Sequence, residues 1–259
     1  MKSVICLCIA LLLVLTPLAM SVGPNEFLDG LVLYHPYDEG KDAEAEDLSG
    51  NEHHGVIDNP KWVNGKFGKA LEFGGPGSDV FVTVESTDAL NVDAFSFMAW
   101  INSEEWNGVR QVVGKSVHGG CGGRVQYGVF SDAGVFKIRL ETEAGRADIA
   151  TDLPETGEFV HIAFTNDTKK TKIYYDGKEV QEGDTPGKLA ANDDPWRVGQ
   201  DCGRLNYVFS GIIDEVRLWN RALSEDEINT FMDQGVDALV VEATGKLSTT
   251  WGSLKASLQ

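Results

Sequence analysis

The sequence predicts an all-β protein whose strands pair antiparallel in a two-layer sandwich. Short runs rich in β-branched and aromatic residues recur along the chain, and several of them alternate apolar and polar positions. Turn residues, not helical periods, separate these runs, which is typical of an antiparallel sandwich. The expected strands include residues 80–84, 95–101, 125–130, 135–140, 159–165, 172–175 and 213–219.

The alternation is clearest at residues 95–100 and 135–140, where apolar positions mostly recur every second residue. A period of two means that one face of the strand is buried and the other is solvated. Asp176-Gly177 separates two such runs and predicts a tight hairpin, because both positions tolerate positive φ. The glycine-rich stretches 74–77 and 119–123 predict loops.

One short helix is expected after the last core strand. Ser224 is followed three residues later by Glu227, which is the spacing of a capping box. Ile228, Phe231 and Met232 then share one helical face, and Gly235 is expected near the end of the helix.

The first residues read as a signal peptide, 1–21. Lys2 precedes an apolar run that is too short for an ordinary membrane span, and Ala19 and Ser21 suit a cleavage site after Ser21. An uncleaved anchor helix is the alternative. We therefore expect a secreted or periplasmic protein with one domain at 22–241 and a C-terminal extension at 242–259, where the alternation is lost.

The formal net charge of −18 argues against nucleic acid and anionic membranes as partners. A chain this acidic repels nucleic acid and anionic membranes, and we expect no membrane insertion. Removal of the leader leaves Cys121 and Cys202, and a disulfide between them is the default in an exported protein. Two buried free thiols are the alternative.

Four stretches in order resemble the laminin-G-like family of concanavalin A-like jelly rolls, which is related to pentraxins. They are residues 31–34 (LVLY) with 47–55 (DLSGNEHHG), 65–73 (GKFGKALEF), 95–101 (FSFMAWI) and 211–224 (GIIDEVRLWNRALS). Together they bracket nearly the whole expected domain. The resemblance implies an antiparallel jelly-roll sandwich.

The resemblance also implies a structural Ca²⁺ between the opening loop and the closing strand. Asp47 and Asn51 are short oxygen-bearing side chains in a turn-rich loop, a composition that hard cations favour. Asp214 lies inside an apolar strand, where a carboxylate is costly unless it is paired or bound to a metal. Asp47, Asn51 and Asp214 are the expected ligands, with backbone oxygens near His54 and Gly55. The alternative is that Asp214 pairs with an arginine or caps loop amides without an ion.

Residue patterns for catalysis are missing. Glucanases of this fold carry Glu-x-Asp-x-(x)-Glu on one strand, which aims the carboxylates into one cleft, and no such spacing occurs. Glu141-Thr-Glu143 lacks the central Asp, and His161 lies within a strand as a core residue would. We therefore expect no enzyme; a glycoside hydrolase or lyase with a nonlocal carboxylate pair is the remote alternative.

A binding module is the expectation, with an extracellular glycan as the first partner and a cell-surface protein as the alternative. Sugar recognition combines aromatic platforms with amides and charged groups that fix hydroxyls. Trp106 is a loop aromatic that could stack on a sugar, whereas Trp62, Trp100 and Trp219 lie in apolar strands. The two cysteine loops supply the expected polar contacts, unless these are ordinary surface: Lys115, His118, Arg124, Gln126, Gln200, Asp201, Arg204, Asn206 and Tyr207.

Overall fold

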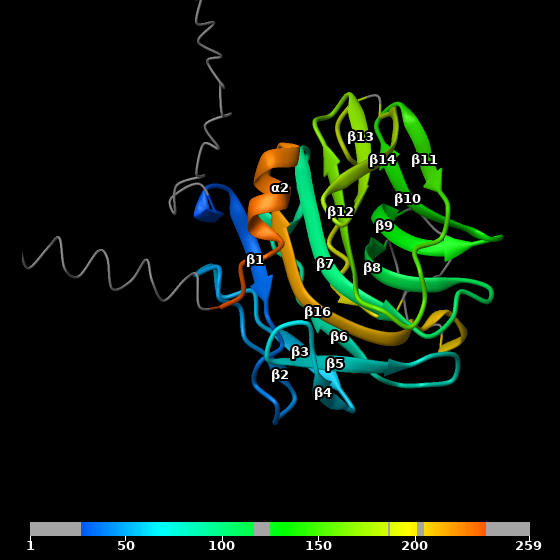
Figure 1. The fold of residues 1–259 in the computed structure, drawn as a ribbon. Helices are drawn as coiled ribbons and strands as arrows, with labels where there is room; N and C mark the ends of the chain where they lie inside the picture. The colour runs from blue at the N-terminus through cyan, green and yellow to red at the C-terminus, as the bar shows by residue number, and fades with distance from the viewer. Residues whose placement is uncertain (1–26, 117–124, 186, 201–204, 237–259) are drawn as a thin grey trace, which may run out of the picture.

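The described part of the chain forms a sandwich of two antiparallel sheets with eight strands each (Figure 1). The computed structural model describes residues 27–116, 125–185, 187–200 and 205–236. The predicted signal peptide 1–21 and the C-terminal extension 242–259 lie outside the described residues. The all-β jelly-roll class predicted from the sequence is confirmed.

The first sheet, called sheet A, has the order β14-β13-β12-β7-β16-β5-β4, and β1 also pairs with β16. Its strands are β1 (Leu31–His35), β4 (Trp62–Asn64), β5 (Lys69–Gly74), β7 (Phe95–Ser103), β12 (Val160–Asn166), β13 (Lys170–Tyr175), β14 (Lys178–Asp184) and β16 (Ser210–Trp219).

The second sheet, called sheet B, has the order β11-β10-β9-β8-β15-β6-β3-β2. Its strands are β2 (Glu44–Ala45), β3 (Gly55–Asp58), β6 (Phe81–Val84), β8 (Arg110–Ser116), β9 (Val125–Asp132), β10 (Val135–Thr142), β11 (Gly145–Thr151) and β15 (Trp196–Val198). Two 3₁₀ turns, η1 (Asp88–Leu90) and η2 (Leu205–Tyr207), lie in the connections.

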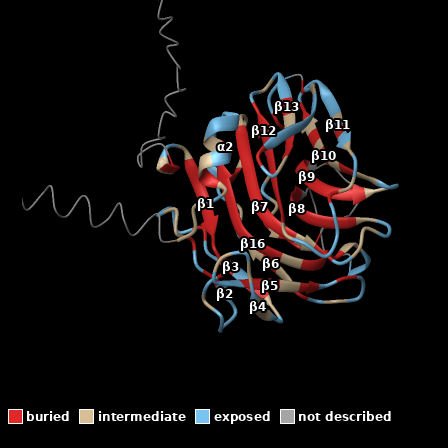
Figure 2. Cartoon of the chain, viewed as in Figure 1, coloured by how far each residue is buried: buried red, intermediate tan, exposed pale blue. Residues whose placement is uncertain are grey.

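The main hydrophobic core lies between the two sheets, where the central strands are buried (Figure 2). In β10, Phe136, Ile138 and Leu140 point into this core while Lys137 and Arg139 point outward. The alternation that predicted this strand is therefore the alternation between the core and the outer face of sheet B.

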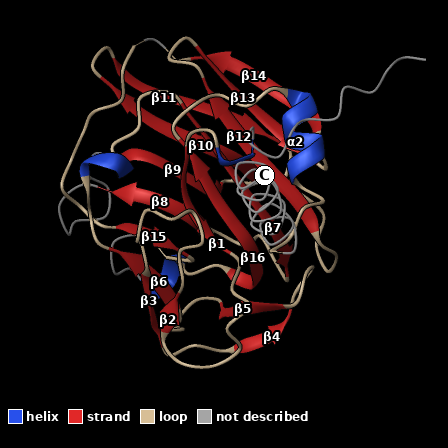
Figure 3. Cartoon of the chain, turned by 90° about the vertical axis from the view of Figure 1, so that its left-hand side faces the viewer, coloured by secondary structure: helices blue, strands red, loops and turns tan. Residues whose placement is uncertain are grey.

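The helix α2 (Glu225–Phe231) packs on the outer face of sheet A, away from β8 and β9 (Figures 1 and 3). The capping box is confirmed: Ser224 Oγ accepts from Glu227 N, and the Glu227 carboxylate accepts from Ser224 N. Ile228 and Phe231 fill a second core with Met98 and Trp219. Because this core covers its outer face, β7 is buried on both sides.

The helix ends before the expected Gly235, and side chains of sheet A explain the early end. Arg217 donates to the carbonyl oxygen of Phe231 at 2.7 Å, and the Trp100 indole donates to that of Met232 at 3.0 Å. Donors of this kind replace the missing amides at a helix C-terminus.

The seven strands expected from sequence are present, as is the hairpin at Asp176-Gly177, whose residues have φ of 47° and 75°. The loop at 74–77 is confirmed, whereas 119–123 lies in a stretch that the structure does not describe. The strands that our expectation did not include are mostly short or polar, such as β11 and β15. No helix among the described residues is long and apolar enough to span a membrane.

Candidate functional site

The opening loop is organised around the Asp47 carboxylate. Asp47 Oδ1 accepts hydrogen bonds from Tyr34 N at 2.9 Å and Ser49 N at 3.0 Å. Its Oδ2 accepts from Ser49 Oγ at 2.7 Å and His53 N at 2.9 Å. Both oxygens are thus used by the protein itself, and Asp47 acts as a cap that holds the loop against β1.

The other expected ligands of this loop also have protein partners. Asn51 Nδ2 donates to the carbonyl oxygens of Leu31 and Val32, both at 3.0 Å. His54 is exposed, and its Nδ1 accepts from Asp47 N at 3.1 Å. Gly55 begins β3, opposite Ala45 in β2.

Asp214 faces a different segment of the chain. It is fully buried, its Oδ2 accepts from Phe67 N at 3.0 Å, and its Oδ1 has no partner. Burial raises the pKa of this carboxyl to about 8, and the nearby acids Glu215 and Asp38 act in the same direction. Asp214 thus accepts a loop amide, as in the alternative drawn from the sequence.

These contacts test whether the expected ligands fit one calcium ion. The Asp47 oxygens are occupied by four donors, and Asp214 meets the turn at Phe67 and not the loop at 47–55. Within the described ranges, no three His, Cys, Asp or Glu side chains gather as a metal site would need. The contacts of the described residues thus show no partner shared by Asp47 and Asp214, and calcium binding by the five expected residues stays a prediction.

Trp106 is held by the protein core. Its ring lies 5.3 Å from Phe136 and 5.6 Å from Phe209, and its indole nitrogen donates to the Pro154 carbonyl oxygen at 2.9 Å. The expectation of a free stacking platform is thus not supported, because core aromatic rings pack against it. A single aromatic in a polar loop sequence gives no sign of such packing.

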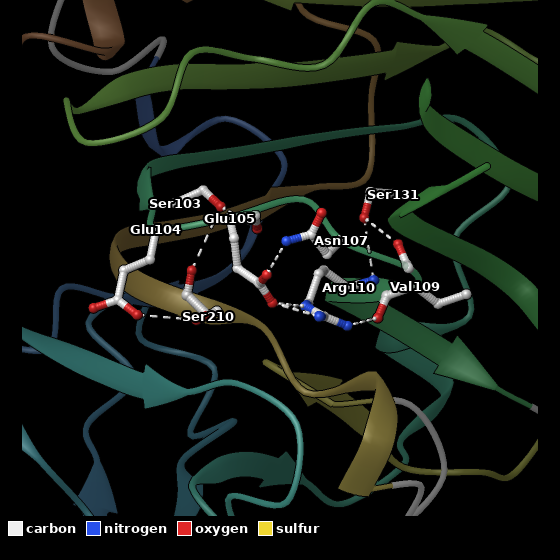
Figure 4. A network of polar contacts seen from close by, with 9 residues as sticks. Ser103, Glu104, Glu105, Asn107, Val109, Arg110, Ser131 and Ser210 are labelled. Atoms are coloured by element: carbon white, nitrogen blue, oxygen red, sulfur yellow. Dashed lines mark hydrogen bonds and ion pairs between the residues drawn. The ribbon is translucent and has the colours of Figure 1, made fainter. Parts of the chain in front are cut away.

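The same loop, between β7 and β8, is fixed by a polar network (Figure 4). Arg110 is buried and binds the Glu105 carboxylate as well as the Val109 carbonyl oxygen. Ser131 on β9 donates to Gly108 and accepts from Arg110 N. The network makes the loop a rigid border of sheet B.

Lys115 is fully buried, contrary to its expected role as a ligand contact. Its ammonium donates to the oxygens of Ser86 and Asn192 and to the carbonyl oxygen of Asp194, at 2.7–3.0 Å. Burial lowers its pKa to about 8. Lys115 thus fastens the segment before β15, and no donor remains for a ligand.

Strand register defines the outer face of sheet B. Gly128 on β9 pairs with Gly114 on β8 and Arg139 on β10, and Gly114 pairs with Arg197 on β15. Directly paired residues share a face, and their chain neighbours belong to the core, so this row points outward. We call this surface the B face: Gln111, Gly114, Gly128, Phe130, Lys137, Arg139 and Arg197.

The B face combines an aromatic ring, cations and an amide around the paired glycines Gly114 and Gly128. Lys137 Nζ and the Arg139 guanidinium lie 5.6 and 5.2 Å from the Phe130 ring centre. Gln111 lies over the glycine pair, since a Cβ at Gly114 would come within 2.6 Å of its Nε2. Glycine inside a strand weakens it and often marks close approach of another group.

Two expected contact residues are buried amides with unsatisfied polar atoms. Gln126, at the register shift of β9 two residues before Gly128, is 1% exposed and its Oε1 has no partner. Gln200, just past β15, is also 1% exposed, and both Oε1 and Nε2 lack partners. Buried polar atoms without hydrogen bonds are rare in proteins, and each requires an explanation.

Strand direction separates these two amides. Gln126 lies near the Lys115 end of β8, whereas β15 runs antiparallel to β8 and places Gln200 near its Gln111 end. At the rise of a strand, the two positions are roughly 13 Å apart. Asn206 and Tyr207 lie in η2, and Asn206 is exposed.

The remaining contact residues cannot be placed. His118, Arg124, Asp201 and Arg204 lie outside the described residues, and so do Cys121 and Cys202 of the expected disulfide.

Sequence reasoning missed Gln111, Phe130, Lys137, Arg139 and Arg197. For Lys137 and Arg139 a signal was present, because they alternate with the apolar residues of β10. Arg197 lies in a strand of three residues, which is too short to show a period.

Two antiparallel sheets around one core, with a polar outer face, define the class of lectin-like jelly-roll sandwiches. A family model described as the concanavalin A-like lectin/glucanases superfamily matches residues 76–229, more than half of the chain. The chain therefore belongs to this superfamily. No curated protein sequence matches the chain.

Solved structures show the same fold at low sequence identity. The binding domain of Paraclostridial Mosquitocidal Protein 1 is 19% identical, with a TM-score of 0.64 over 79% of this chain and 52% of that one. Trypanosoma rangeli sialidase is 18% identical, with a TM-score of 0.61 over 80% of this chain and 34% of that one. The present chain thus matches about half of the first and a third of the second.

A third structure is matched over nearly its whole length. Domain 4 of AbnA, a GH43 extracellular arabinanase from Geobacillus stearothermophilus, was solved in complex with arabinotriose. It is 18% identical, with a TM-score of 0.54, covering 77% of this chain and 96% of that one. At such identities the likeness concerns the fold alone.

Proposed function

We propose that the protein is an extracellular, non-catalytic carbohydrate-binding module that takes up a glycan on the B face. The observation that carries this proposal is the unpartnered buried amide oxygen of Gln126, next to the polar B face that contains Gly114 and Gly128. Sugar hydroxyls can donate to such an oxygen, and the amide of Gln111, which lies over the two glycines, is a further polar group on this face.

The ion pairs of this side of sheet B support a role without catalysis. Glycoside hydrolysis needs one carboxyl that gives up a proton and a second that is free to attack or to activate water. Asp148 is held by Arg139 at 2.8 Å, Glu141 by Arg146 at 2.7 Å and Asp132 by Lys137 at 3.1 Å. Each of these carboxylates is thus engaged by a cation and is unsuited to proton transfer.

The structural neighbours favour binding over catalysis. The arabinanase domain in complex with arabinotriose is an isolated domain of this fold with a bound sugar, and the mosquitocidal protein domain is named a binding domain. By analogy of fold, a binding role is the first expectation for the present chain.

A glycan array probed with purified residues 22–259 tests the proposal. Gly128→Val adds a side chain in the middle of the B face, where its Cβ would meet Gln111 Nε2 at 3.4 Å. We expect Gly128→Val to lose the hits of the native chain. Ala150→Val, on the exposed edge strand β11 of the same sheet, is the control and should keep them.

The outcomes separate the two classes of partner. Loss of hits in Gly128→Val alone supports the B face, provided that its thermal unfolding matches that of the control. A folded native chain without any hit rejects glycan binding and favours protein adhesion, which a pull-down would then examine. Hits retained by Gly128→Val would place the sugar elsewhere.

A further inference from the structure

Arg197 differs from every other arginine that the structure describes. Its Nε is buried without an acceptor, and no acid among the described residues forms an ion pair with its guanidinium. The other described arginines are each paired with a carboxylate: Arg110 with Glu105, Arg139 with Asp148, Arg146 with Glu141, Arg217 with Glu215, and Arg221 with Asp29 and Glu227. In a chain of net charge −18, an arginine without an acidic partner is unexpected.

The two residues paired with Arg197 in the sheet are small and uncharged, and the exposed acid Glu85, diagonal to it on the same face, forms no ion pair with another described residue. Its partners in register are Thr83 on β6 and Gly114 on β8. The strand register continues from Arg197 across the sheet in both directions. The first acids reached in this line of paired residues are Glu44, three strands away, and Asp148, four strands away. At the usual strand spacing these are roughly 14 and 19 Å distant, too far for an ion pair.

The chemistry of a guanidinium indicates which ligand group Arg197 could bind. Its planar fork matches the two oxygens of a carboxylate, and such bonds are stronger than those between neutral groups. Because the chain as a whole repels anions, an acidic ligand would need one specific cation at its binding site. Arg197 stands next to Gly114 on the B face, where the proposed glycan would lie.

We propose that Arg197 binds the carboxylate of an acidic sugar, so that the B face selects glycans containing uronic or similar acids over neutral ones. The inference rests on the proposed function of the B face and deepens it. The neutral sugar rings then lie beside Gln111 on the B face, and the carboxylate accepts two hydrogen bonds from the guanidinium.

The experiment compares acidic oligosaccharides with their own neutral forms. Fragments of hyaluronan, polygalacturonate and alginate are titrated by calorimetry beside the same fragments with each carboxyl reduced to an alcohol. The native chain is measured with Arg197→Gln, Arg197→Lys and the control Arg146→Gln, which removes one positive charge from the edge strand β11. Thermal unfolding confirms that each variant is folded.

We expect the native chain to bind at least one acidic fragment about 10- to 100-fold more tightly than its reduced form, as a charged hydrogen bond would give. Arg197→Gln should bind both forms equally, Arg197→Lys should keep part of the preference, and Arg146→Gln should behave as the native chain. Equal loss in Arg146→Gln would show that net charge, and not Arg197, sets the preference, and would overturn the inference.

Two further results would overturn it, and they differ in what they say of the B face. If the native chain binds the reduced fragments or neutral array glycans as tightly as acidic ones, and Gly128→Val abolishes this binding, the inference fails while the proposed function stands. If no fragment and no array glycan binds, both fail together.

Discussion

The side chain of Gln200 offers a direct test of the unpartnered amides. It is 1% exposed, and neither Oε1 nor Nε2 has a hydrogen-bond partner. A buried polar group without a partner costs about 1–3 kcal/mol of stability. Methionine has a similar length, bends easily and carries no group that needs a partner. Gln200→Met should therefore stabilise the free protein.

The expected gain is about 2 kcal/mol in the free energy of unfolding, which for a domain of this size raises the melting temperature by about 4–8 °C. Thermal unfolding followed by circular dichroism, and urea unfolding, measure it. Gln181→Met is the control: Gln181 is exposed on β14, so its change should stay within about 0.5 kcal/mol.

A lower melting temperature for Gln200→Met would refute the reasoning, because it would mean that the amide has favourable partners in the free protein. A stabilised variant that also loses glycan affinity would add a second result. It would show that the amide is kept for a ligand at the expense of stability, a trade-off that is common at functional sites.

Three further predictions follow from the buried charges. Asp47→Asn should lower the free energy of unfolding by about 1.5–3 kcal/mol equally in calcium and in EDTA, and a loss seen only in calcium would make Asp47 an ion ligand. Arg217→Met leaves the Glu215 carboxylate buried and unpaired and should cost about 3–5 kcal/mol in urea unfolding, most of which Glu215→Gln should restore. Burial, together with Arg217 and Lys66, lowers the pKa of His161 to about 3. Since the unfolded chain binds this proton near pH 6.5, stability should fall by up to about 1.4 kcal/mol per unit as the pH drops from 6.5 towards 3. His161→Gln should flatten that slope, and an unchanged slope would contradict a neutral buried imidazole.

The sequence predicted the fold well because the strands of the core obey local rules. The alternation of β10, the hairpin at Asp176-Gly177 and the capping box at Ser224 are each settled by residues close in sequence. β15 and β11 escaped prediction because three residues show no period and a polar edge strand carries little apolar signal.

The site was less predictable, because its properties depend on partners far apart in sequence. Lys115 reads as a polar loop residue until Asn192 and Asp194 fold around its ammonium. Trp106 reads as exposed until Phe136 and Phe209 pack against it. Conversely, Arg197 becomes notable only because strand register surrounds it with Thr83 and Gly114. Burial and pairing of this kind depend on tertiary structure, and a local sequence pattern does not predict them.

The distribution of exposed apolar side chains bears on the choice between a sugar and a protein as the partner. The large hydrophobic residues exposed in the described part of the chain are Val56 at 61%, Leu205 at 45% and Val180 at 39%, and they lie on β3, η2 and β14. A protein-binding surface usually has a contiguous apolar centre, which these scattered residues do not supply. An apolar partner would also leave Gln126 Oε1 without a donor and Arg197 Nε without an acceptor, at a further cost in desolvation. Under our proposals, a hydroxyl-rich ligand with one carboxylate would offer partners to both groups, so the unsatisfied polar atoms are the reason for proposing a glycan.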